Sequence, residues 1–589
     1  MERKISVLPT ANKLVQLLQK NDRKFLILSV AICALSGLAS SSIVLIKQRF
    51  FEAVEELPYG TGIQLAMGLG LFWAVFTVIA LIVQAVSDIL IEDLGIRIGG
   101  RIGQSVNEKA AKIPPISYET TEILDCINKA YQGVEQSADA IKLIVMLCSY
   151  YIPYFAFFAI YSYFISPVLC LGVFVILLPT VVGQYVRSHY YTAFEDTVAP
   201  IRRKMIYYRS CITEREYVKE TRLLGAVYFF RNLYETSLLL FKKESWKTER
   251  KSAILELGLR LCSLTAYVVI LAVMYQSLRR GVMGTAAFVA ILTSLDQSFN
   301  YMDYVGYNIG EISVSMPALI NSIHFLNLPE KDGVEVSLEH NAVDIRQVSF
   351  KYPGSEKYAL HNVNVHIEEG ETIAVVGGNG SGKSTFTKLV LGLYMPTDGD
   401  IFVGGYNTKE VTSNSIFKNN SAVFQNFQKY KMMLKDNISI SNVKQNADDQ
   451  TFSDIMRSVD LEDNEVLFPE GLDTMLAKEY GGTDLSGGQW QRVAIGRGLY
   501  RSHDLIVLDE PTAAIDPVEE SKLYRQFAEI AKNKTALIVT HRLGSAKIAD
   551  RILVLDNGCL DDIGTHEELM TRKGRYKEMY DAQAKWYET

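Results

Sequence analysis

The sequence lacks the features of a disulfide-stapled, zinc-binding or nucleic-acid-binding protein. Its seven cysteines are an odd number and show no paired spacing of a zinc or redox motif, which favours a reducing compartment. The formal net charge is −6, so no basic excess indicates a nucleic-acid partner. No internal repeat or low-complexity tract is present, which excludes repeat architectures. There is no cleavable signal either, because the first apolar run begins near Phe25 and lasts about 20 residues, enough to span a bilayer.

Long apolar runs are absent after about residue 310 and frequent before it. The candidate membrane spans are residues 25–46, 65–91, 141–165, 168–187, 254–277 and 283–309. The long connections after the second and fourth spans are rich in Lys and Arg, so they are expected on the cytoplasmic side. An even number of spans puts both termini there as well. The sequence therefore predicts a multi-pass protein of the cell (plasma) membrane.

The distribution of apolar and polar segments predicts a multi-domain chain. We expect an amphipathic cytoplasmic lead at residues 1–24 and a six-helix, all-α transmembrane domain at residues 25–326, whose helices extend far into the cytoplasm. A polar linker at residues 327–341 leads to an α/β P-loop domain at residues 342–589.

The sixth span carries an unusual number of polar residues. Asp296, Asn300 and Asp303 recur at i, i+4 and i+7, so they share one helix face, which Tyr304 and Tyr307 continue. Polar groups are costly against lipid, so this face is expected to line a water-filled cavity for a cargo. Inter-helix packing with internal hydrogen bonds is the alternative. If the cavity exists, its acids favour a neutral or cationic amphipathic cargo.

A phosphate-binding loop follows the apolar strand at residues 373–376 and opens a helix. Its glycines allow backbone N–H groups to approach phosphate oxygens, and the helix N-terminus adds its dipole. Lys383 offers a compact cation to the phosphates, and Ser384 offers a hydroxyl to Mg²⁺. The nucleotide-contacting residues predicted here are Gly377, Asn379, Gly380, Ser381, Gly382, Lys383, Ser384 and Thr385.

Two adjacent acids end a second apolar strand at residues 505–508. The carboxylate of Asp509 suits a Mg²⁺ ligand, held directly or through water. Glu510 follows it, where a carboxylate could polarise an attacking water as a general base. Alone this pattern is weak, but together with the phosphate loop it predicts a nucleotide hydrolase that uses ATP and Mg²⁺.

The stretch Leu485-Ser486-Gly487-Gly488-Gln489 lies between these two motifs. The order of the three motifs resembles the ATPase of the ABC superfamily, and the whole chain resembles an exporter half-transporter. That resemblance implies a dimer in which Ser486, Gly487, Gly488 and Gln489 cap the ATP bound to the opposite subunit. A hydroxyl and an open backbone N–H at a helix start suit that role.

The same resemblance implies roles for further residues. Gln425 matches a residue that contacts Mg²⁺ and couples to the membrane domain, and His541 matches one that contacts the γ-phosphate. Tyr352 matches the aromatic residue that stacks on adenine. The bend segments at residues 114–125 and 215–224 match the coupling helices that dock on the ATPase domains.

These features together predict an ATP hydrolase coupled to transport, which exports a cargo as a homodimer in membrane lipid. The run Gln489-Trp490-Gln491 resembles bacterial exporters of lantibiotic-like peptides, which suggests a peptide cargo and a bacterial source. The open alternatives are a heterodimer with a degenerate partner, a lipid flippase, a multidrug exporter, and an ATP-gated channel or regulator. Soluble ABC ATPases are excluded by the membrane spans.

Overall fold

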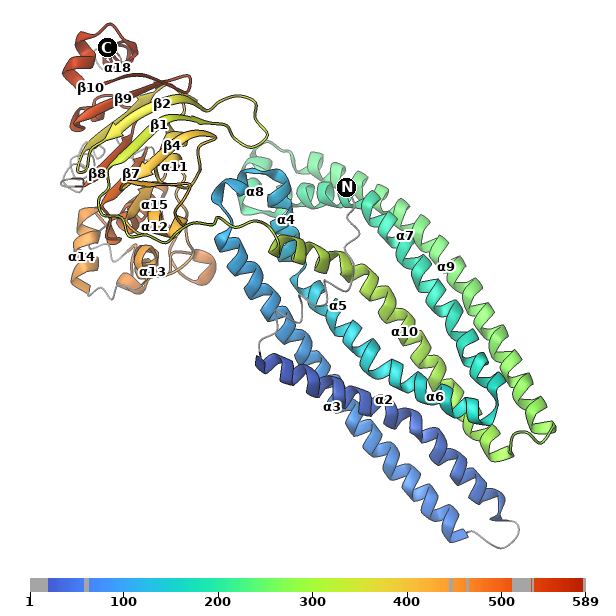
Figure 1. The fold of residues 1–589 in the computed structure, drawn as a ribbon. Coiled ribbons are helices and arrows are strands. Elements are labelled where there is room, and N and C mark those ends of the chain that lie inside the picture. Colours follow the sequence, from blue (N-terminus) through green and yellow to red (C-terminus); the bar gives the residue numbers. More distant parts are fainter. Residues whose placement is uncertain are drawn as a thin grey trace. The chain divides into compact units, whose positions relative to one another are not determined.

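The structure is a computed structural model that describes residues 20–57, 63–443, 449–461, 466–510, 531 and 534–585. The chain divides into two compact units, Met1–Ala111 with Asp125–Leu328 and Lys112–Leu124 with Pro329–Thr589. The first is all helical and the second is α/β, and we call them the helical unit and the α/β unit (Figure 1). The predicted fold class is therefore confirmed. Most of the predicted N-terminal lead lies outside the described residues.

The helical unit consists of long helices, whose apolar stretches supply the faces that pack or meet lipid. Its elements are α2 Lys20–Glu55, α3 Ile63–Lys112, α4 Thr121–Gln132, α5 Val134–Met146, η3 Leu147–Tyr151, α6 Ile152–Ile165, α7 Pro167–Thr213, α8 Arg215–Leu223, α9 Val227–Arg279 and α10 Thr285–Leu326. At 1.5 Å per residue, the 50 residues of α3 and the 53 of α9 exceed the thickness of a bilayer. Both helices therefore extend beyond it, as the periodicity predicts.

Five helical segments in the described part of the chain are long and apolar enough to cross a membrane. They are Asp22–Glu55, Ile63–Lys112, Val134–Ile165, Val227–Arg279 and Thr285–Leu326. They contain five of the six predicted spans, including the polar sixth. The remaining predicted span, residues 168–187, lies in the 47-residue helix α7, where the side chains of many residues are outside what the structure describes.

The third span contains a π-helical segment, η3, immediately before Pro153. Proline lacks an N–H, and its ring would clash with the carbonyl four residues earlier, at Ser149, which explains the wider turn. The segment places three tyrosines around Tyr301 of α10. The hydroxyl of Tyr150 donates to that of Tyr301 at 2.8 Å, and the rings of Tyr154 and Tyr301 meet edge to face at 4.7 Å. An aromatic cluster thereby joins the third and sixth spans.

The α/β unit consists of Lys112–Leu124 and Pro329–Thr589. Its described elements are η2 Pro115–Glu119, β1 Val343–Phe350, β2 Leu360–Ile367, β3 Thr372–Gly377, α11 Lys383–Val390, β4 Asp398–Val403, β5 Tyr406–Asn407, α12 Ser413–Phe417, β6 Asn420–Val423, α13 Leu434–Ser439, α14 Asp449–Ser458, α15 Gly487–Tyr500, β7 Leu505–Asp509, β8 Thr535–Val539, β9 Arg551–Asp556, β10 Cys559–Gly564, α17 His566–Thr571 and α18 Arg575–Lys585, with short 3₁₀ turns between them.

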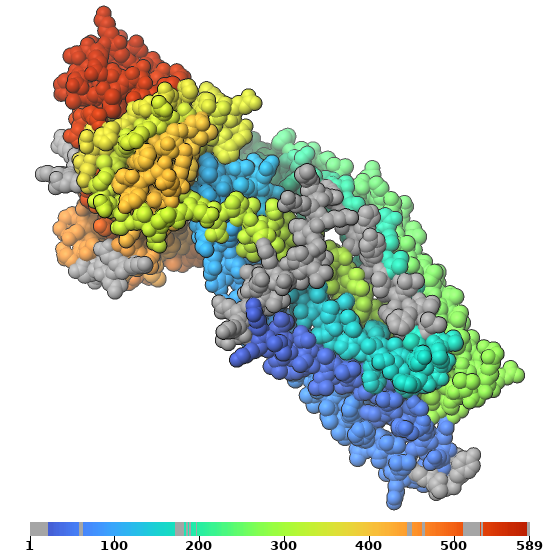
Figure 2. Space-filling view, viewed as in Figure 1, coloured from blue at the N-terminus to red at the C-terminus, as the bar shows by residue number. Residues whose placement is uncertain are grey.

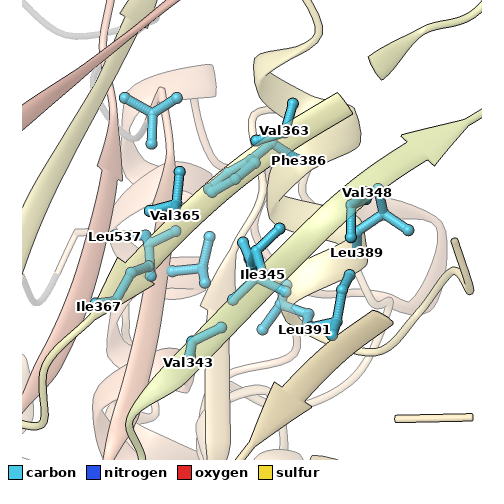
Figure 3. Packing of buried hydrophobic residues seen from close by; sticks show 14 of the residues in the cluster. Val343, Ile345, Val348, Val363, Val365, Ile367, Phe386, Leu389, Leu391 and Leu537 are labelled. Carbon is cyan, nitrogen blue, oxygen red and sulfur yellow. The ribbon is translucent and has the colours of Figure 1, made fainter. Parts of the chain in front are cut away.

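The larger sheet has the strand order β10-β9-β3-β8-β7-β6, in which all neighbours are parallel except β10 and β9. Both faces of the central strands β3, β8 and β7 are covered, so these strands read as nearly unbroken apolar runs. In β3, Ile373 and Val375 belong to a core shared with β1, β2 and α11 (Figure 3). Ala374 and Val376 belong to a second core, with α17 and α18, on the opposite face. This two-sided burial holds the strand ends rigidly.

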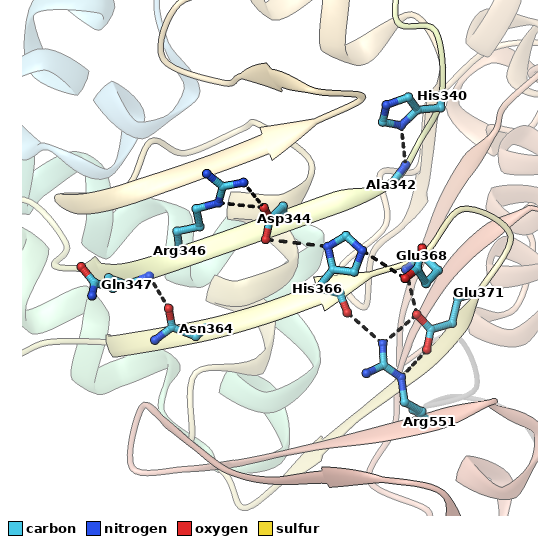
Figure 4. Close-up of polar contacts among 10 residues, drawn as sticks. All are labelled: His340, Ala342, Asp344, Arg346, Gln347, Asn364, His366, Glu368, Glu371 and Arg551. Carbon is cyan, nitrogen blue, oxygen red and sulfur yellow. Dashed lines mark hydrogen bonds and ion pairs between the residues drawn. The ribbon is translucent and has the colours of Figure 1, made fainter.

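The smaller sheet is antiparallel, with the order β2-β1-β4-β5. Figure 2 shows its atoms, yellow to orange, at the surface of the α/β unit. Arg551 of β9 connects the two sheets (Figure 4): its Nη2 donates to the carbonyl oxygen of His366 and to Glu371 Oε2, both at 2.8 Å. Burial alone would raise the pKa of Glu371, but the Arg551 guanidinium and the Glu368 N–H hold that pKa below its ordinary value.

The first predicted coupling segment is part of the α/β unit. Residues 112–124 cluster with that unit, and Ile116 packs against the core beneath α11. The hydroxyl of Tyr394 donates to Glu119 Oε1 at 2.5 Å, and Lys388 Nζ, from α11, donates to that hydroxyl at 3.2 Å. Residues at or just after the end of α11, the helix that follows the phosphate loop, are thus hydrogen-bonded to the segment that follows α3 in the chain. The second predicted coupling segment forms α8, within the helical unit.

The segment predicted as a linker also packs on the α/β unit. Val334 pairs with Val411 in a short parallel bridge, and Lys331 Nζ donates to the carbonyl oxygen of Thr408 at 3.0 Å. Farther on, the N–H of Val336 donates to Ser415 Oγ at 2.9 Å. The chain after α10 is therefore held along the surface of the α/β unit before β1 begins.

Candidate nucleotide site and membrane cavity

The nucleotide site lies at the carboxyl ends of four neighbouring parallel strands. In the order β3-β8-β7-β6, these strands are followed by the phosphate loop, by His541, by Glu510 and by Gln425, respectively. Parallel strands bring their carboxyl ends to one edge of a sheet, and ligands of α/β proteins bind there. The pairing therefore collects four groups that are separated by up to 160 residues in the chain.

The phosphate loop needs glycine at two positions for steric reasons. Gly377 has φ +153, and a Cβ there would lie 2.2 Å from the carbonyl oxygen of Leu555. Gly382 has φ +102, and a Cβ there would lie 2.7 Å from the carbonyl oxygen of Ala359. Residues other than glycine rarely adopt such φ values. Gly378 has open space instead. Sequence reasoning assigned the glycines to close phosphate approach, and the structure shows that packing within the protein requires them too.

Lys383 is the first residue of α11, and its side chain folds back over the loop. Its Nζ donates to the carbonyl oxygens of Gly377 at 3.0 Å and of Gly378 at 2.9 Å. Burial lowers the pKa of Lys383, while the carboxylates of Glu510 and Asp509 act in the opposite direction. A cation with only carbonyl partners in a buried position would be stabilised by a phosphate group.

Asp509 and Ser384 bring two oxygen atoms together beside the loop. Ser384 Oγ lies 3.5 Å from Asp509 Oδ1, and Asp509 is buried at the end of β7. Burial raises the pKa of Asp509, so a nearby cation would favour its ionised form. Hydroxyl and carboxylate oxygens suit Mg²⁺, which takes one or two protein ligands and completes its shell with phosphates and water. Among the residues that the structure describes, no group of three or more His, Cys, Asp or Glu side chains is arranged to hold a metal ion by itself. The donor set thus fits Mg²⁺ held together with a nucleotide.

Glu510 is held by side chains from both neighbouring strands. Gln425 Nε2 donates to its Oε2 at 2.6 Å, and His541 Nε2 contacts its Oε1. The backbone of Glu510 has φ 49, a strained value for a residue other than glycine, and its N–H donates to the carbonyl oxygen of Val539 at 3.1 Å. Sequence reasoning proposed three separate roles for Glu510, Gln425 and His541, and the structure brings both Gln425 and His541 into contact with Glu510.

The protonation of His541 follows from its surroundings. Burial lowers its pKa, the Lys383 ammonium lowers it further, and Glu510 opposes both. Because the net pKa lies below the ordinary value near 6.5, His541 is neutral at pH 7. One ring nitrogen can then donate while the other accepts. The contact with γ-phosphate that the family resemblance implies stays a prediction.

Tyr352 lies on the other side of the phosphate loop. Its hydroxyl is 3.0 Å from Thr385 Oγ1 on α11, and its ring meets those of Phe350 and Tyr394 edge to face at 5.1 and 6.0 Å. These contacts fix the ring of Tyr352 next to α11, the helix that follows the phosphate loop. Stacking on adenine stays a prediction.

The signature residues begin helix α15. Ser486 Oγ accepts from the N–H of Gln489 at 3.3 Å, and Gln489 Oε1 accepts from the N–H of Ser486 at 2.8 Å. This reciprocal pair is a capping box, which the spacing of Ser and Gln could have predicted. Ser486, Gly487, Gly488 and Gln489 do not line the cavity beside the phosphate loop of their own chain. Their predicted role in a second subunit's site stays a prediction.

The polar face of α10 lines a cavity of about 1030 Å³ within the helical unit. All five predicted residues are among its lining: Asp296, Asn300, Asp303, Tyr304 and Tyr307. Helices α7 and α9 add charged residues that sequence reasoning did not assign to a cavity: Arg187, Glu256 and Arg260. Arg260 and Glu256 form an ion pair at 3.0 Å. The sequence did contain a signal for Arg260, because an ionisable residue within an apolar span usually faces a cavity or the interior of the helix bundle. The use of this space by a cargo stays a proposal.

The two glycine environments give a matched test of the loop. Gly382→Ala should raise the Kd for a fluorescent ATP analogue roughly 5- to 150-fold, since overpacking strain costs about 1–3 kcal/mol. Gly378→Ala should leave that Kd within about twofold, because no atom lies within 4 Å of its Cβ position. Fluorescence titration of both variants in detergent measures the Kd. Equal losses in the two variants would contradict the steric explanation.

Comparison with known proteins agrees with this geometry. Residues 360–513 match the family model described as ABC transporter. The chain is 32% identical over 390 residues to the subtilin transport ATP-binding protein SpaT of Bacillus subtilis, covering 65% of this chain and 63% of that one. It is 32% identical over 314 residues to the nisin transport ATP-binding protein NisT of Lactococcus lactis subsp. lactis, covering 52% of each chain. It is 35% identical over 241 residues to the ATP-dependent lipid A-core flippase of Escherichia coli K12, covering 41% of each.

These matches span less than two thirds of each of these relatives. The fold extends further: a bacterial Atm1-family ABC exporter with ATP bound superposes with a TM-score of 0.81 at 20% identity, covering 95% of this chain and 99% of that one. The motifs, the matched domain and the shared fold agree. Residues 360–513 therefore form an ABC transporter domain, and the chain as a whole shares the fold of an ABC exporter, with a helical unit and an α/β unit.

Proposed function

We propose that the chain is one half of a homodimeric exporter that hydrolyses ATP, with Mg²⁺, to move a cargo out of a bacterial cytoplasm. The observation that carries this proposal is the carboxylate of Glu510, which contacts Gln425 and His541 next to the phosphate loop. A polarising carboxylate, a neutral histidine and a buried lysine are the groups that nucleotide hydrolysis needs. Their presence in a chain with apolar spans supports energy-driven transport.

Each residue of the candidate site would have a distinct role in hydrolysis. Lys383 and the loop amides would hold and neutralise the phosphates, and Glu510 would orient a water and accept its proton. Gln425 and His541 would hold the carboxylate of Glu510 in place. Ser384 and Asp509 would hold Mg²⁺, which supplies charge neutralisation to the phosphates when it is bound. Tyr352 would provide an aromatic surface for the adenine.

Two copies of the chain are needed to complete a site. The signature residues of α15 do not line the cavity beside the phosphate loop of their own chain, so a second copy would supply them. Because the phosphate loop and the signature are both intact, a homodimer would have two competent sites. This completeness favours the homodimer over a pairing with a degenerate partner. The nucleotide-binding domain would face the cytoplasm, where ATP is available.

A peptide is the cargo class that we favour. Two of the relatives are named for transport of subtilin and nisin, and the cavity can take an amphipathic ligand. No ion pair joins Asp296 or Asp303 to another described residue, whereas Glu256 is paired with Arg260. The cavity thus presents two unpaired acids, next to tyrosines that offer apolar contact with polar tips. A lipid is the alternative, since another relative is named as a flippase.

Replacement of the proposed base tests the hydrolytic mechanism. Glu510→Gln should retain ATP binding and lower the steady-state ATPase rate of the full chain in lipid by about 10²–10⁴-fold, because the general base is lost. His541→Ala should be slow in the same range. Phosphate release and nucleotide binding are measured on the same samples. Turnover of Glu510→Gln within a few-fold of wild type would refute the base assignment.

Mixed dimers test the shared site. Ser486→Arg and Lys383→Ala should each abolish the ATPase activity of their homodimers, because every site uses one phosphate loop and one signature. In a heterodimer, both defects fall in one site and the other site is intact. Tandem-tag purification of the heterodimer should therefore recover about half of the wild-type rate. The lack of any recovery in a verified heterodimer would argue against sites shared between subunits.

The cavity acids allow a test of the cargo. Asp296→Asn combined with Asp303→Asn should raise the half-maximal concentration for ATPase stimulation by cationic amphipathic peptides about two- to thirtyfold, since each exposed charge contributes roughly 0.2–1 kcal/mol. Basal ATPase activity and thermal stability should not change. Asp93→Asn on α3 is the matched control, because Asp93 does not line the cavity. A joint fall in basal activity and stability would show that the pair is structural; stimulation by lipids alone would favour a flippase.

A further inference from the structure

The loop that carries His541 is bonded to the last helix of the chain through one side chain, Gln583. This residue lies near the end of α18, and the loop follows strand β8. Gln583 Nε2 donates to the carbonyl oxygen of His541, and Gln583 Oε1 accepts from the N–H of Leu543 at 3.0 Å. The amide nitrogen and the amide oxygen of Gln583 thus both bond to the backbone, one at the residue before Arg542 and the other at the residue after it.

The position of Gln583 is fixed by the packing of α18. Tyr576 of this helix is buried in the same core as Leu543 and the sheet residue Val376. Its hydroxyl is 2.8 Å from His566 Nδ1, and Lys547 lies 5.0 Å from the ring of Tyr580. The packing therefore fixes the position of α18, and the two hydrogen bonds of Gln583 hold the His541 loop against this helix.

Thr540 holds the backbone on the amino-terminal side of His541. Thr540 is buried, its N–H donates to the carbonyl oxygen of Val375 at 3.3 Å, and its Oγ1 accepts from the N–H of Arg542 at 3.0 Å. The imidazole itself is 40% exposed and reaches Glu510. The bonds of Thr540 anchor the start of the loop, and those of Gln583 anchor His541 and Leu543. A fixed backbone on both sides of a half-exposed side chain restricts where its ring can lie.

The space around these bonds belongs to the nucleotide site. A cavity of about 330 Å³ is lined by residues of the phosphate loop, of the His541 loop and of α18. Its lining residues are Gly377, Gly378, Asn379, Thr540, His541, Leu543, Met579, Ala582 and Gln583. The C-terminal helix thus forms one wall of the cavity beside the loop that would hold the phosphates.

We propose that Gln583 is a positioning residue for ATP hydrolysis, which holds the His541 backbone so that its imidazole meets Glu510. The inference rests on the proposed function, because it assigns a role within that reaction. Gln583 would act through His541 and not on the nucleotide, so its loss should affect turnover more than ATP affinity. The amide of Gln583 offers a donor and an acceptor at any pH, and Asn, which is one carbon shorter, would not reach both backbone groups.

Three variants of the full chain in lipid separate positioning from folding. Gln583→Leu removes both bonds, Gln583→Glu keeps the acceptor for Leu543 and loses the donor, and Asp581→Asn changes an exposed group on the same helix. Gln583→Leu should lower kcat for ATP about 10- to 100-fold, the scale seen when a catalytic group is displaced from a distance. Its KM for ATP should stay within about threefold, and Asp581→Asn should behave as wild type.

The glutamate variant supplies a pH signature. A carboxylate facing the carbonyl oxygen of His541 is repulsive, whereas the protonated acid can donate as the amide does. An ordinary Glu pKa lies near 4.3, and burial raises it. The ratio of Gln583→Glu activity to wild-type activity should therefore rise as the pH falls from about 8 to 5.5, and the ratio for Gln583→Leu should stay flat. Taking the ratio at each pH removes the pH dependence that the variant and the wild type have in common.

The outcomes are distinguishable. A wild-type chain that does not hydrolyse ATP would overturn the proposed function, and the positioning role with it. If wild type hydrolyses ATP while Gln583→Leu has a normal kcat, only the positioning role fails. A lower thermal stability of Gln583→Leu, with kcat and KM changed in proportion and no pH dependence in Gln583→Glu, would show that Gln583 serves only to fasten α18.

Discussion

The parallel pairing of β3, β8, β7 and β6 is the constraint on which the nucleotide site depends. The register pairs Val375 with Val539 and Asp509 with Val539, so the ends of these strands are level. Apolar side chains alternate between two covered faces, and a shift by one residue would exchange the two cores. The hydrophobic pattern of the strands therefore determines where the phosphate loop, His541 and Glu510 lie, although none of these residues is apolar.

Rigid packing also sustains the unfavourable features of the site. A buried lysine bonded to carbonyl groups, a buried aspartate with a raised pKa and a left-handed backbone at Glu510 each cost free energy. They persist because two cores hold the strands beneath them. The first two would become more favourable next to a bound Mg²⁺–nucleotide, since phosphate would pair with Lys383 and the metal with Asp509. The cost is therefore concentrated where a ligand can relieve it.

Much of this arrangement could be predicted from the sequence. The motifs near residues 377, 485 and 509 carry local signals, and the apolar runs identified the domain types and the polar face of α10. Contacts between distant residues could not be predicted, because they depend on strand order: the sequence placed Gln425 and His541 in separate roles, and no motif connected Gln583 to His541. The packing of residues 112–124 on the α/β unit and the position of Arg187 in the cavity depend likewise on tertiary structure.

Both candidate functional sites occur where the chain departs from the packing rules that it obeys elsewhere. The central strands of the large sheet, β3, β8 and β7, are buried and mostly apolar, and polar groups converge at their carboxyl ends. The sixth span packs one face through small and apolar residues such as Ala290, Ile291 and Leu295 and leaves acids and tyrosines exposed on the other. In a membrane, such a face requires water or a polar ligand beside it. The same physical rule thus accounts for the position of the candidate nucleotide site in the sheet and of the polar cavity among the helices.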